Sequence, residues 1–324
     1  MVTLAPHDTG SFVVAATFLR DRPAFALGDG TVLLLGEEGE RRIQVHRGGL
    51  LAAARMRDGG ALVSGGDDGQ VMFTAADGSV TQLAELPRKW IDIVATGPQD
   101  AVAFAAGRTA VVRLASGELR EFPQARAVGG LAFAPKGLRL AVARYDGATL
   151  YWVNTNAPEQ ALAWKGAHTG ATFSPDGKYL VTTMQENALH GWRLADGQDM
   201  RMTGYPSKVK ATDWSAKGRY LATSGANAAI LWPFFGKTGP MGQQPLQLGA
   251  RGDQIVTALA CHPGEEVMAI GYQDGMVLGV RFADTQEAVM RRPGEGPVTA
   301  LSWDAGGTRL VFGTETGAAG VIAL

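Results

Sequence analysis

One passage recurs along the whole chain, and it limits the possible folds more than any other feature. The segment 166–204 contains four short apolar or alternating runs, at 169–174, 179–184, 189–194 and 199–203. Turn-forming residues such as Pro175-Asp176-Gly177 separate these runs, a pattern that predicts four antiparallel β-strands. Four strands cannot bury both faces of their own sheet. The unit must therefore stack against copies of itself.

Further copies of the first strand can be aligned at a spacing of about forty residues, the period typical of propeller blades. The eight copies are Ala16–Phe18, Ala54–Met56, Ile93–Ala95, Leu131–Phe133, Ala171–Phe173, Thr212–Trp214, Leu259–Cys261 and Leu301–Trp303. We therefore predict an all-β fold, a β-propeller of eight four-stranded blades forming a single domain over residues 1–324. Seven blades is the alternative if the stretch from Trp90 to Pro123 is irregular.

The second and third strands of each repeat are joined by a hairpin that carries Gly or Asn at one position in every repeat except the third. These two residue types adopt the left-handed backbone conformation most easily. We therefore predict that Asn187 and Asn227 replace Gly as turn residues, and Arg108 is the exception. The glycines at this position are Gly30, Gly69, Gly147, Gly275 and Gly317.

The last repeat, 297–324, contains only three strands. Val2-Thr3-Leu4-Ala5 lies as far before the first repeat as a fourth strand lies before the later ones. We predict that this N-terminal strand completes the last blade, because an unpaired edge would otherwise template aggregation.

Several motifs resemble the WD-repeat (WD-40) β-propeller family over essentially the full length. They are Gly166-Ala167-His168 before a first strand, Ser174-Pro175-Asp176-Gly177-Lys178 after it, Gly66-Asp67-Asp68-Gly69 in a hairpin, and the third-strand residues Trp152, Trp192 and Trp232. None of these three tryptophans is followed by Asp. The resemblance implies a buried network involving His168, Thr183 and Trp192, with Glu186 at the usual acid. It also implies a non-catalytic scaffold for protein or peptide binding.

Composition argues against several classes of function. Thirty basic and 31 acidic residues leave a net charge of -1, so we expect no nucleic-acid partner. The lone cysteine, Cys261, excludes an intramolecular disulfide. No basic segment precedes the apolar run 12–19, which is too short to span a membrane. We expect a cytoplasmic protein that does not bind membranes and is monomeric by itself.

The sequence contains no convincing catalytic motif. It lacks a Gly-x-Ser-x-Gly motif, a phosphate-binding loop and a paired-carboxylate motif. Cys261 beside His262 is compatible with a metal or nucleophile site, but its alignment with Phe and Trp favours core packing. The other histidines show no ligand spacing, so we predict no enzyme, no cofactor and no metal. The alternative is a propeller enzyme or small-ligand binder that uses the central channel, since the inner strands are small at 52–54, 129–130 and 169–171.

Two surfaces are the candidate partner-binding sites. One is the rim formed by the hairpins and by the loops that enter each first strand, where aromatic and Arg residues are common interface anchors. Its residues are Arg88, Lys89, Trp90, Arg108, Arg144, Tyr145, Lys208, Arg251 and Tyr272. For Trp90, inward packing at the start of a strand is the alternative. The other surface is the blade-six insertion 233–242, with Phe234, Phe235 and Met241.

Overall fold

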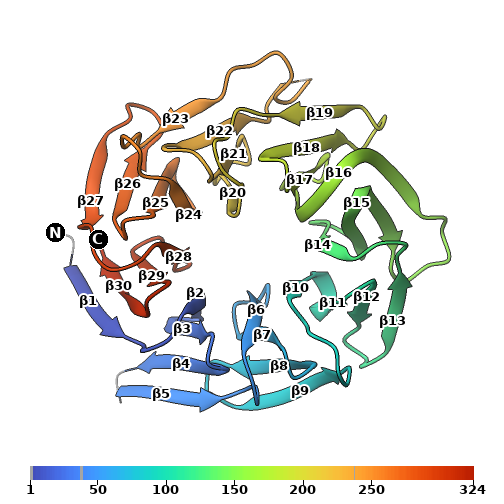
Figure 1. The fold of residues 1–324 in the computed structure, drawn as a ribbon, viewed down its shortest axis with the longest axis horizontal. Helices are drawn as coiled ribbons and strands as arrows, with labels where there is room; N and C mark the ends of the chain where they lie inside the picture. Colours follow the sequence, from blue (N-terminus) through green and yellow to red (C-terminus); the bar gives the residue numbers. More distant parts are fainter. Residues whose placement is uncertain (1–2, 37–38, 237) are drawn as a thin grey trace. The chain divides into compact units, whose positions relative to one another are not determined.

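A computed structural model describes residues 3–36, 39–236 and 238–324, and nearly all of its regular structure is β-strand (Figure 1). The strands group into two compact units. The first contains Met1–Leu27, Leu33–Glu40 and Tyr205–Leu324, and the second contains Gly28–Val32 and Arg41–Gly204. That they make a single domain stays a prediction.

Three four-stranded sheets lie within the first unit, and a fourth has residues in both units. The latter is β2 (Val13–Leu19), β3 (Arg22–Leu27), β4 (Thr31–Gly36) and β5 (Gly39–Gln44). The others are β20 (Thr212–Trp214), β21 (Tyr220–Thr223), β22 (Ala229–Pro233) and β23 (Leu246–Leu248); β24 (Val256–Cys261), β25 (Val267–Tyr272), β26 (Val277–Arg281) and β27 (Glu287–Arg291); and β28 (Val298–Trp303), β29 (Arg309–Thr314) and β30 (Ala318–Ala323) with β1 (Thr3–Asp8).

The second unit contains two four-stranded sheets and one of six strands. The four-stranded sheets are β6 (Leu50–Arg55), β7 (Ala61–Gly66), β8 (Gln70–Ala75) and β9 (Val80–Glu85), and β10 (Ile93–Thr96), β11 (Val102–Ala106), β12 (Thr109–Arg113) and β13 (Leu119–Pro123), with the short 3-10 helix η1 (Pro98–Asp100). The larger sheet is β14 (Val128–Phe133), β15 (Arg139–Trp152), β16 (Gln160–Phe173), β17 (Tyr179–Met184), β18 (Ala188–Arg193) and β19 (Asp199–Met202).

The described residues thus form seven separate sheets, and the prediction of eight blades is not supported; seven matches only the stated alternative. The reason differs from the one anticipated, because the stretch 90–123 contains a regular four-stranded sheet. The eight sequence repeats give seven sheets because two of them share the sheet β14–β19. Strand β15 reverses at Asp146 and Gly147, which have positive φ, so that the Val153 N–H donates to the Leu138 carbonyl at 2.9 Å. Strand β16 then pairs with β15 along its first half and with β17 along its second.

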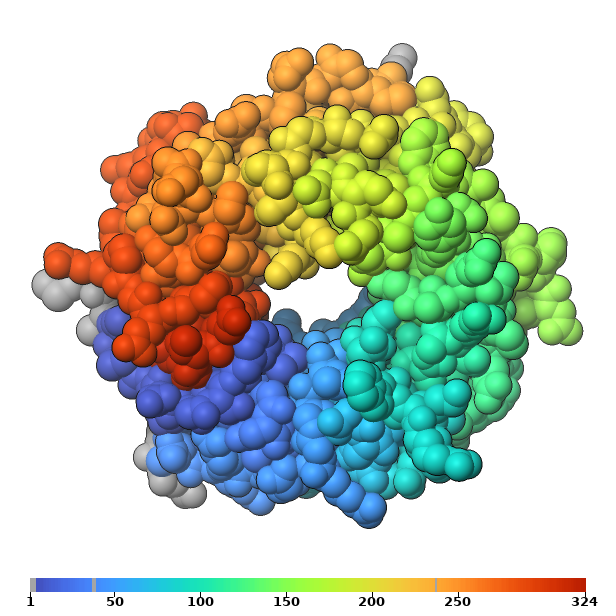
Figure 2. Space-filling model, viewed as in Figure 1, coloured from blue at the N-terminus to red at the C-terminus, as the bar shows by residue number. Residues whose placement is uncertain are grey.

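The predicted N-terminal strand is confirmed. Strand β1 pairs antiparallel with β30 from Thr3 opposite Ala323 to Asp8 opposite Ala318, and Figure 1 shows these two strands at the same edge. Val2, the first residue of the predicted strand, lies outside the described residues. In the space-filling view of Figure 2, the dark-blue N-terminal residues lie directly against the red C-terminal ones.

The predicted hairpin glycines and Asn187 all have positive φ, between 52° and 126°. The prediction for Asn227 is wrong. The left-handed residue of that hairpin is Gly225, while the Asn227 side chain donates to the Gly252 carbonyl at 2.7 Å. At the exceptional third repeat the left-handed residue is Gly107, directly before Arg108.

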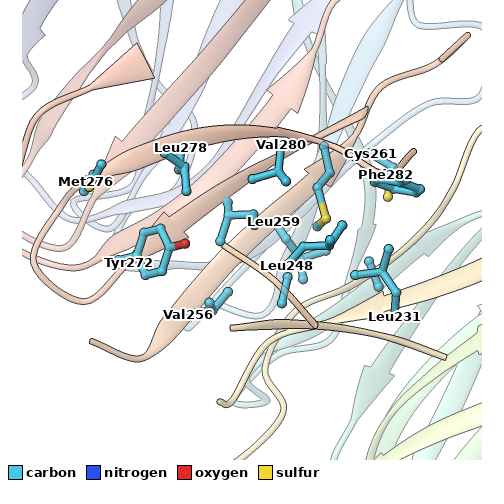
Figure 3. Packing of buried hydrophobic residues seen from close by; sticks show 14 residues of the cluster. Leu231, Leu248, Val256, Leu259, Cys261, Tyr272, Met276, Leu278, Val280 and Phe282 are labelled. Atoms are coloured by element: carbon cyan, nitrogen blue, oxygen red, sulfur yellow. The ribbon is translucent and has the colours of Figure 1, made fainter. Parts of the chain in front are cut away.

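The middle strands of the sheets contribute most of the buried core residues. All residues of β7 and β11 are buried, whereas the outer strand β13 alternates between exposed and half-buried residues. Cys261 packs among Leu231, Leu259 and Phe282 (Figure 3), so its predicted core position is confirmed. Burial raises the pKa of its thiol well above the ordinary value.

The small residues of the inner strands have a packing reason. A Cβ atom added to Gly129 of β14 would lie 2.0 Å from the His168 carbonyl oxygen of β16, and one added to Gly130 would lie 2.6 Å from the Gly170 Cα. Both contacts are with backbone, which cannot move aside cheaply. These glycines therefore allow two neighbouring inner strands to approach closely.

Candidate functional site

The candidate surface is one end of the sheets in the second unit. Because neighbouring strands are antiparallel, the loops entering each first strand and the hairpins between second and third strands reach the same end of each sheet. We call this surface the loop end. Its segments are 45–49, 66–69, 86–92, 107–108, 124–127, 145–147, 164–167 and 185–187.

Trp90 is the most exposed large apolar residue of the chain that the structure describes. Its exposed fraction is 68%, and it lies in the loop before β10, which begins only at Ile93. The neighbouring Ile91 has an exposed fraction of 0% and supplies the inward contact. The alternative in which Trp90 packs inward is therefore wrong.

Basic side chains are frequent along the loop end. Six exposed cations lie there, against three exposed acids, Asp92, Asp146 and Glu186. The cations are Arg47, Arg88, Lys89, Arg108, Arg126 and Lys165. None of these six forms an ion pair within the described part of the chain, whereas Glu186 Oε1 accepts a hydrogen bond from the Ala167 N–H at 3.1 Å. Two further acids of these segments, Asp67 and Asp68, are half-buried, so it is the fully accessible side chains of the loop end that carry more positive than negative charge.

Arg88 is held in a strained backbone conformation. It follows Pro87 in a turn closed by the Lys89 N–H, which donates to the Leu86 carbonyl at 3.2 Å, and its φ is 63°. A side chain in this region costs about 1–3 kcal/mol, and such residues cluster at functional sites. The Arg88 side chain is exposed in this turn, and the strained backbone conformation is the energetic cost of placing it there.

We expect Arg88→Gly to keep or raise the free energy of unfolding, by up to about 1 kcal/mol, because glycine adopts positive φ without strain. Arg108→Gly is the matched control. The left-handed residue of that hairpin is Gly107, so this substitution relieves no backbone strain. Urea denaturation measures both. Equal losses of stability in the two variants would contradict the strain at Arg88.

The remaining rim residues of the second unit are less exposed than Trp90. Tyr145 is 44% exposed beside the reversal of β15. Arg144 is half-buried and donates to the Thr149 hydroxyl at 3.1 Å, so part of its side chain is engaged internally.

In the first unit, only Lys208 among the predicted rim residues is fully exposed. Tyr272 has an exposed fraction of 0% and its hydroxyl donates to the Gly249 carbonyl, so its prediction as a surface anchor is wrong. Arg251 pairs with the Asp274 carboxylate at 3.0 Å and lies over the Tyr272 ring at 4.8 Å. No sequence signal distinguished this buried tyrosine from an exposed one.

The blade-six insertion lies largely against its own sheet. Phe234 is 7% exposed and packs edge-on against Trp214 at 4.9 Å, which corrects the expectation of an exposed anchor. Phe235 is half-buried between the Tyr220 ring and the Arg219 guanidinium. Met241 is also half-buried, and Lys237 lies outside the described residues.

The family's polar network is present in altered form. His168 Nδ1 contacts the hydroxyl of Thr182 at 2.7 Å, and the predicted partner Thr183 contacts Thr169 instead. The prediction was wrong by one position, which in a strand moves the side chain to the opposite face. Trp192 is buried beside His168, with ring centroids 5.7 Å apart.

Two further networks were missed in the sequence. His46 contacts the Ser64 hydroxyl at 2.8 Å and the Asp68 carboxylate at 3.1 Å. In the first unit, Tyr205 contacts Thr223, and Trp232 Nε1 donates to the Tyr205 hydroxyl, both at 2.6 Å. For the network of His46, the Asp68-Gly69 hairpin in the sequence could have indicated the acidic partner. These groups bind one another, and we assign them to stabilising the loops.

An aromatic cluster joins the half-buried loop-end residue Trp164 to the buried residues His190 and Trp192. His190 stacks on Trp164 with ring centroids 3.9 Å apart and meets the Trp192 ring edge-on at 4.7 Å. Its exposed fraction is 0% and neither ring nitrogen has a hydrogen-bond partner in the part of the chain that the structure describes. Desolvation lowers the pKa of His190 to about 3.

Among the described residues, no three His, Cys, Asp or Glu side chains gather in a way that could hold a metal ion. The same residues include no helix that is long and apolar enough to cross a membrane.

Comparison with known proteins supports the fold. No family model matches the chain. Echinoderm microtubule-associated protein-like 2 of Rattus norvegicus is 23% identical over 285 residues, which cover 70% of this chain and 44% of that protein. The Mus musculus protein of the same name has the same identity and coverage. The chain therefore spans less than half the length of these relatives.

Two solved structures resemble almost the entire chain. The computationally designed Ika8 protein superposes with a TM-score of 0.79 at 21% identity, over 98% of both chains. The C-terminal WD40 domain of Sif2 superposes with a TM-score of 0.76 at 13% identity, over 99% of this chain and 98% of that one. The resemblance to WD-repeat β-propellers is thus confirmed, with four-stranded blades as the unit of the fold.

Proposed function

We propose that this protein is a non-catalytic cytoplasmic scaffold whose loop end, in the second unit, binds an acidic segment of a protein partner. The single observation that carries the proposal is Trp90, 68% exposed and flanked directly by the cations Arg88 and Lys89. Exposing a tryptophan to water costs free energy that a partner can recover by covering it. Tryptophan and arginine are also the residues most often found at the energetic centres of interfaces.

The charge of the loop end selects the chemistry of the partner. Six exposed cations against three exposed acids attract an anionic surface and disfavour a basic one. A protein segment fits better than a nucleic acid, because the net charge of the chain is -1 and long-range attraction of a polyanion is correspondingly weak. The relatives are named as microtubule-associated proteins, which agrees with binding to a protein surface.

The insertion is a second contact surface within the same proposal. Phe235 and Met241 keep part of their surface accessible, whereas Phe234 packs inward. We assign the insertion a supporting role because Phe235 and Met241 are each half-buried, whereas Trp90 is 68% exposed.

Trp90→Ser is expected to weaken partner binding by about 30-fold, the effect of losing a 2 kcal/mol interface anchor. The partner is first identified by affinity capture from the native source with mass spectrometry. Its acidic segment is then made as a peptide and titrated by calorimetry. Charge reversal by Lys89→Glu is expected to weaken binding further and to reduce its dependence on salt.

Trp152→Ser is the matched control. Trp152 is also an exposed tryptophan, at 40%, but it lies at the end of β15 away from the loop end and packs on Arg139. It should retain the partner. Equal affinity of Trp90→Ser and the unaltered protein would refute the proposed surface.

A further inference from the structure

A second concave surface lies at the opposite end of the sheets in the second unit. A pocket of about 340 Å³ is formed where the first strands β10, β14 and β16 end and turn into the second strands. Its walls include the rings of Phe133 and Phe173 and the turn residues Pro135 and Pro175. This volume is near the lower limit for ligand pockets and suits one side chain or a small molecule.

Among the described residues that line this pocket, Arg57 is the one with a charged side chain. It projects from the turn after β6 and donates to two backbone carbonyls, Ala134 at 3.2 Å and Pro135 at 3.3 Å. These two hydrogen bonds fix the guanidinium plane against the rim of the pocket. A guanidinium carries five N–H donors, so it can still donate to a ligand.

Two hydroxyl groups of the pocket wall already donate to other groups of the protein. The Thr96 hydroxyl donates to the Arg55 carbonyl at 2.7 Å, and the Ser174 hydroxyl donates to the Asp176 carboxylate at 2.7 Å. Burial lowers the pKa of Arg57, yet a guanidinium remains protonated throughout the physiological range. None of the described residues that line the pocket has a carboxylate, although the Asp176 carboxylate accepts a hydrogen bond from the lining residue Ser174.

We propose that this pocket binds a carboxylate carried on a small apolar group. The guanidinium fork matches the two oxygens of a carboxylate, and the phenylalanine and proline walls cover the apolar part. The C-terminal residue of a peptide with an apolar side chain and a free small organic acid share this chemistry. Phosphate-sized anions without an apolar part are disfavoured, because they gain no contact with the apolar part of the pocket wall.

Calorimetry and NMR titration with two matched pairs of probes test the site. The first pair is 3-phenylpropionate and 3-phenylpropanamide, and the second is acetyl-Gly-Gly-Phe with a free or an amidated C-terminus. The carboxylate member of each pair is expected to bind about 10-fold more tightly or better. Tighter binding of the peptide acid assigns the site to chain termini, and tighter binding of the free acid assigns it to small molecules. Equal binding of acids and amides, or no saturable binding of any probe, overturns the proposal.

Arg57→Gln should reduce carboxylate binding to the level of the amide. Arg55→Gln is the matched control, because Arg55 is an exposed neighbour that does not line the pocket. Since Arg57 also holds the turn after β14, Ala132→Leu provides an independent variant that fills the pocket and keeps the guanidinium. Unchanged binding in Ala132→Leu contradicts the site, whatever the folding of Arg57→Gln. Trp90→Ser should bind these probes normally, which separates this site from the loop end.

Discussion

Acidification from pH 6.5 to pH 3 is expected to remove roughly 4–5 kcal/mol of stability through His190 alone, because burial lowers its pKa from 6.5 to about 3. The folded protein disfavours a proton on this ring, whereas the unfolded chain binds one below about pH 6.5. The contribution is therefore complete above pH 6.5 and is lost as the pH falls. The slope is about 1.4 kcal/mol per pH unit.

The groups that face His190 explain why no partner rescues its protonated form. Trp164 and Trp192 offer only ring surfaces, and the charges of His168 and Arg201 oppose a second positive charge. The Asp199 carboxylate lies 3.4 Å from Nε2 without hydrogen-bond geometry and is largely exposed to solvent. Water weakens its attraction.

A group in the first unit has the opposite effect on stability. Desolvation raises the pKa of Asp213 from 3.8 to about 6, so the folded state binds a proton there more readily than the unfolded chain. As the pH falls from 6 to 3.8, protonation of Asp213 therefore raises the free energy of unfolding of the protein. This gain offsets part of the stability that is lost through His190. The stability of the unaltered protein should thus change less than His190 alone implies.

The comparison with His190→Phe isolates the effect. Phenylalanine keeps the stack on Trp164 but cannot titrate. The stability of this variant relative to the unaltered protein should therefore increase by about 1.4 kcal/mol for each pH unit below 6.5. Urea titrations from pH 7 to pH 4 measure it. Parallel pH profiles for the two proteins would show that His190 does not titrate in this range.

Removal of strand β1 is the second large effect that we expect. Deleting Met1–Ala5, which takes half of the six-residue strand, should lower the melting temperature by several degrees, and deleting Met1–Asp8 should lower it further. The deletion breaks the ladder with β30 and exposes the edge of that strand. For a domain of 150–250 residues, each kcal/mol lost lowers the melting temperature by about 2–4 °C.

The control replaces Thr3–Asp8 with six Gly and Ser residues, so that chain length is kept and the strand pattern is lost. It should melt as early as the deletion. Light scattering should also detect self-association of both variants, because β30 then presents unpaired backbone groups. An unchanged melting temperature after deletion would exclude a stabilising role for β1.

Spacing between repeats was the part of the sequence that predicted structure well. The position of β1 followed from its distance to the first repeat, and the packing of Cys261 followed from its alignment with Phe18 and Trp303. Both predictions depend on the spacing of the repeats, which is set by the length of the four strands and their turns. Predictions that needed an exact position within a strand were less reliable, since one residue separates Thr182 from Thr183 and reverses the face.

Exposure at the ends of strands could not be predicted from residue type. Trp90 and Tyr272 are both aromatic residues at corresponding ends of their repeats, yet one is 68% exposed and the other fully buried. At the first position the neighbouring Ile91 is the residue that is buried, and at the second the Gly249 carbonyl accepts a hydrogen bond from the buried Tyr272 hydroxyl. Such local differences in packing are not visible in residue type. The number of sheets was mispredicted for another reason, because β15 and β16 join two repeats in one sheet.

The pairing of the first strand with the last has a consequence during synthesis. The Thr9 hydroxyl donates to the Gly317 carbonyl, and these residues are 308 positions apart. At a translation rate of about 5–20 residues per second, the N-terminal strand waits roughly 15–60 s on the ribosome before its partner exists. Pro6 within β1 lacks an N–H, and His7 and Asp8 are polar, which makes the waiting strand a poor template for the wrong neighbour.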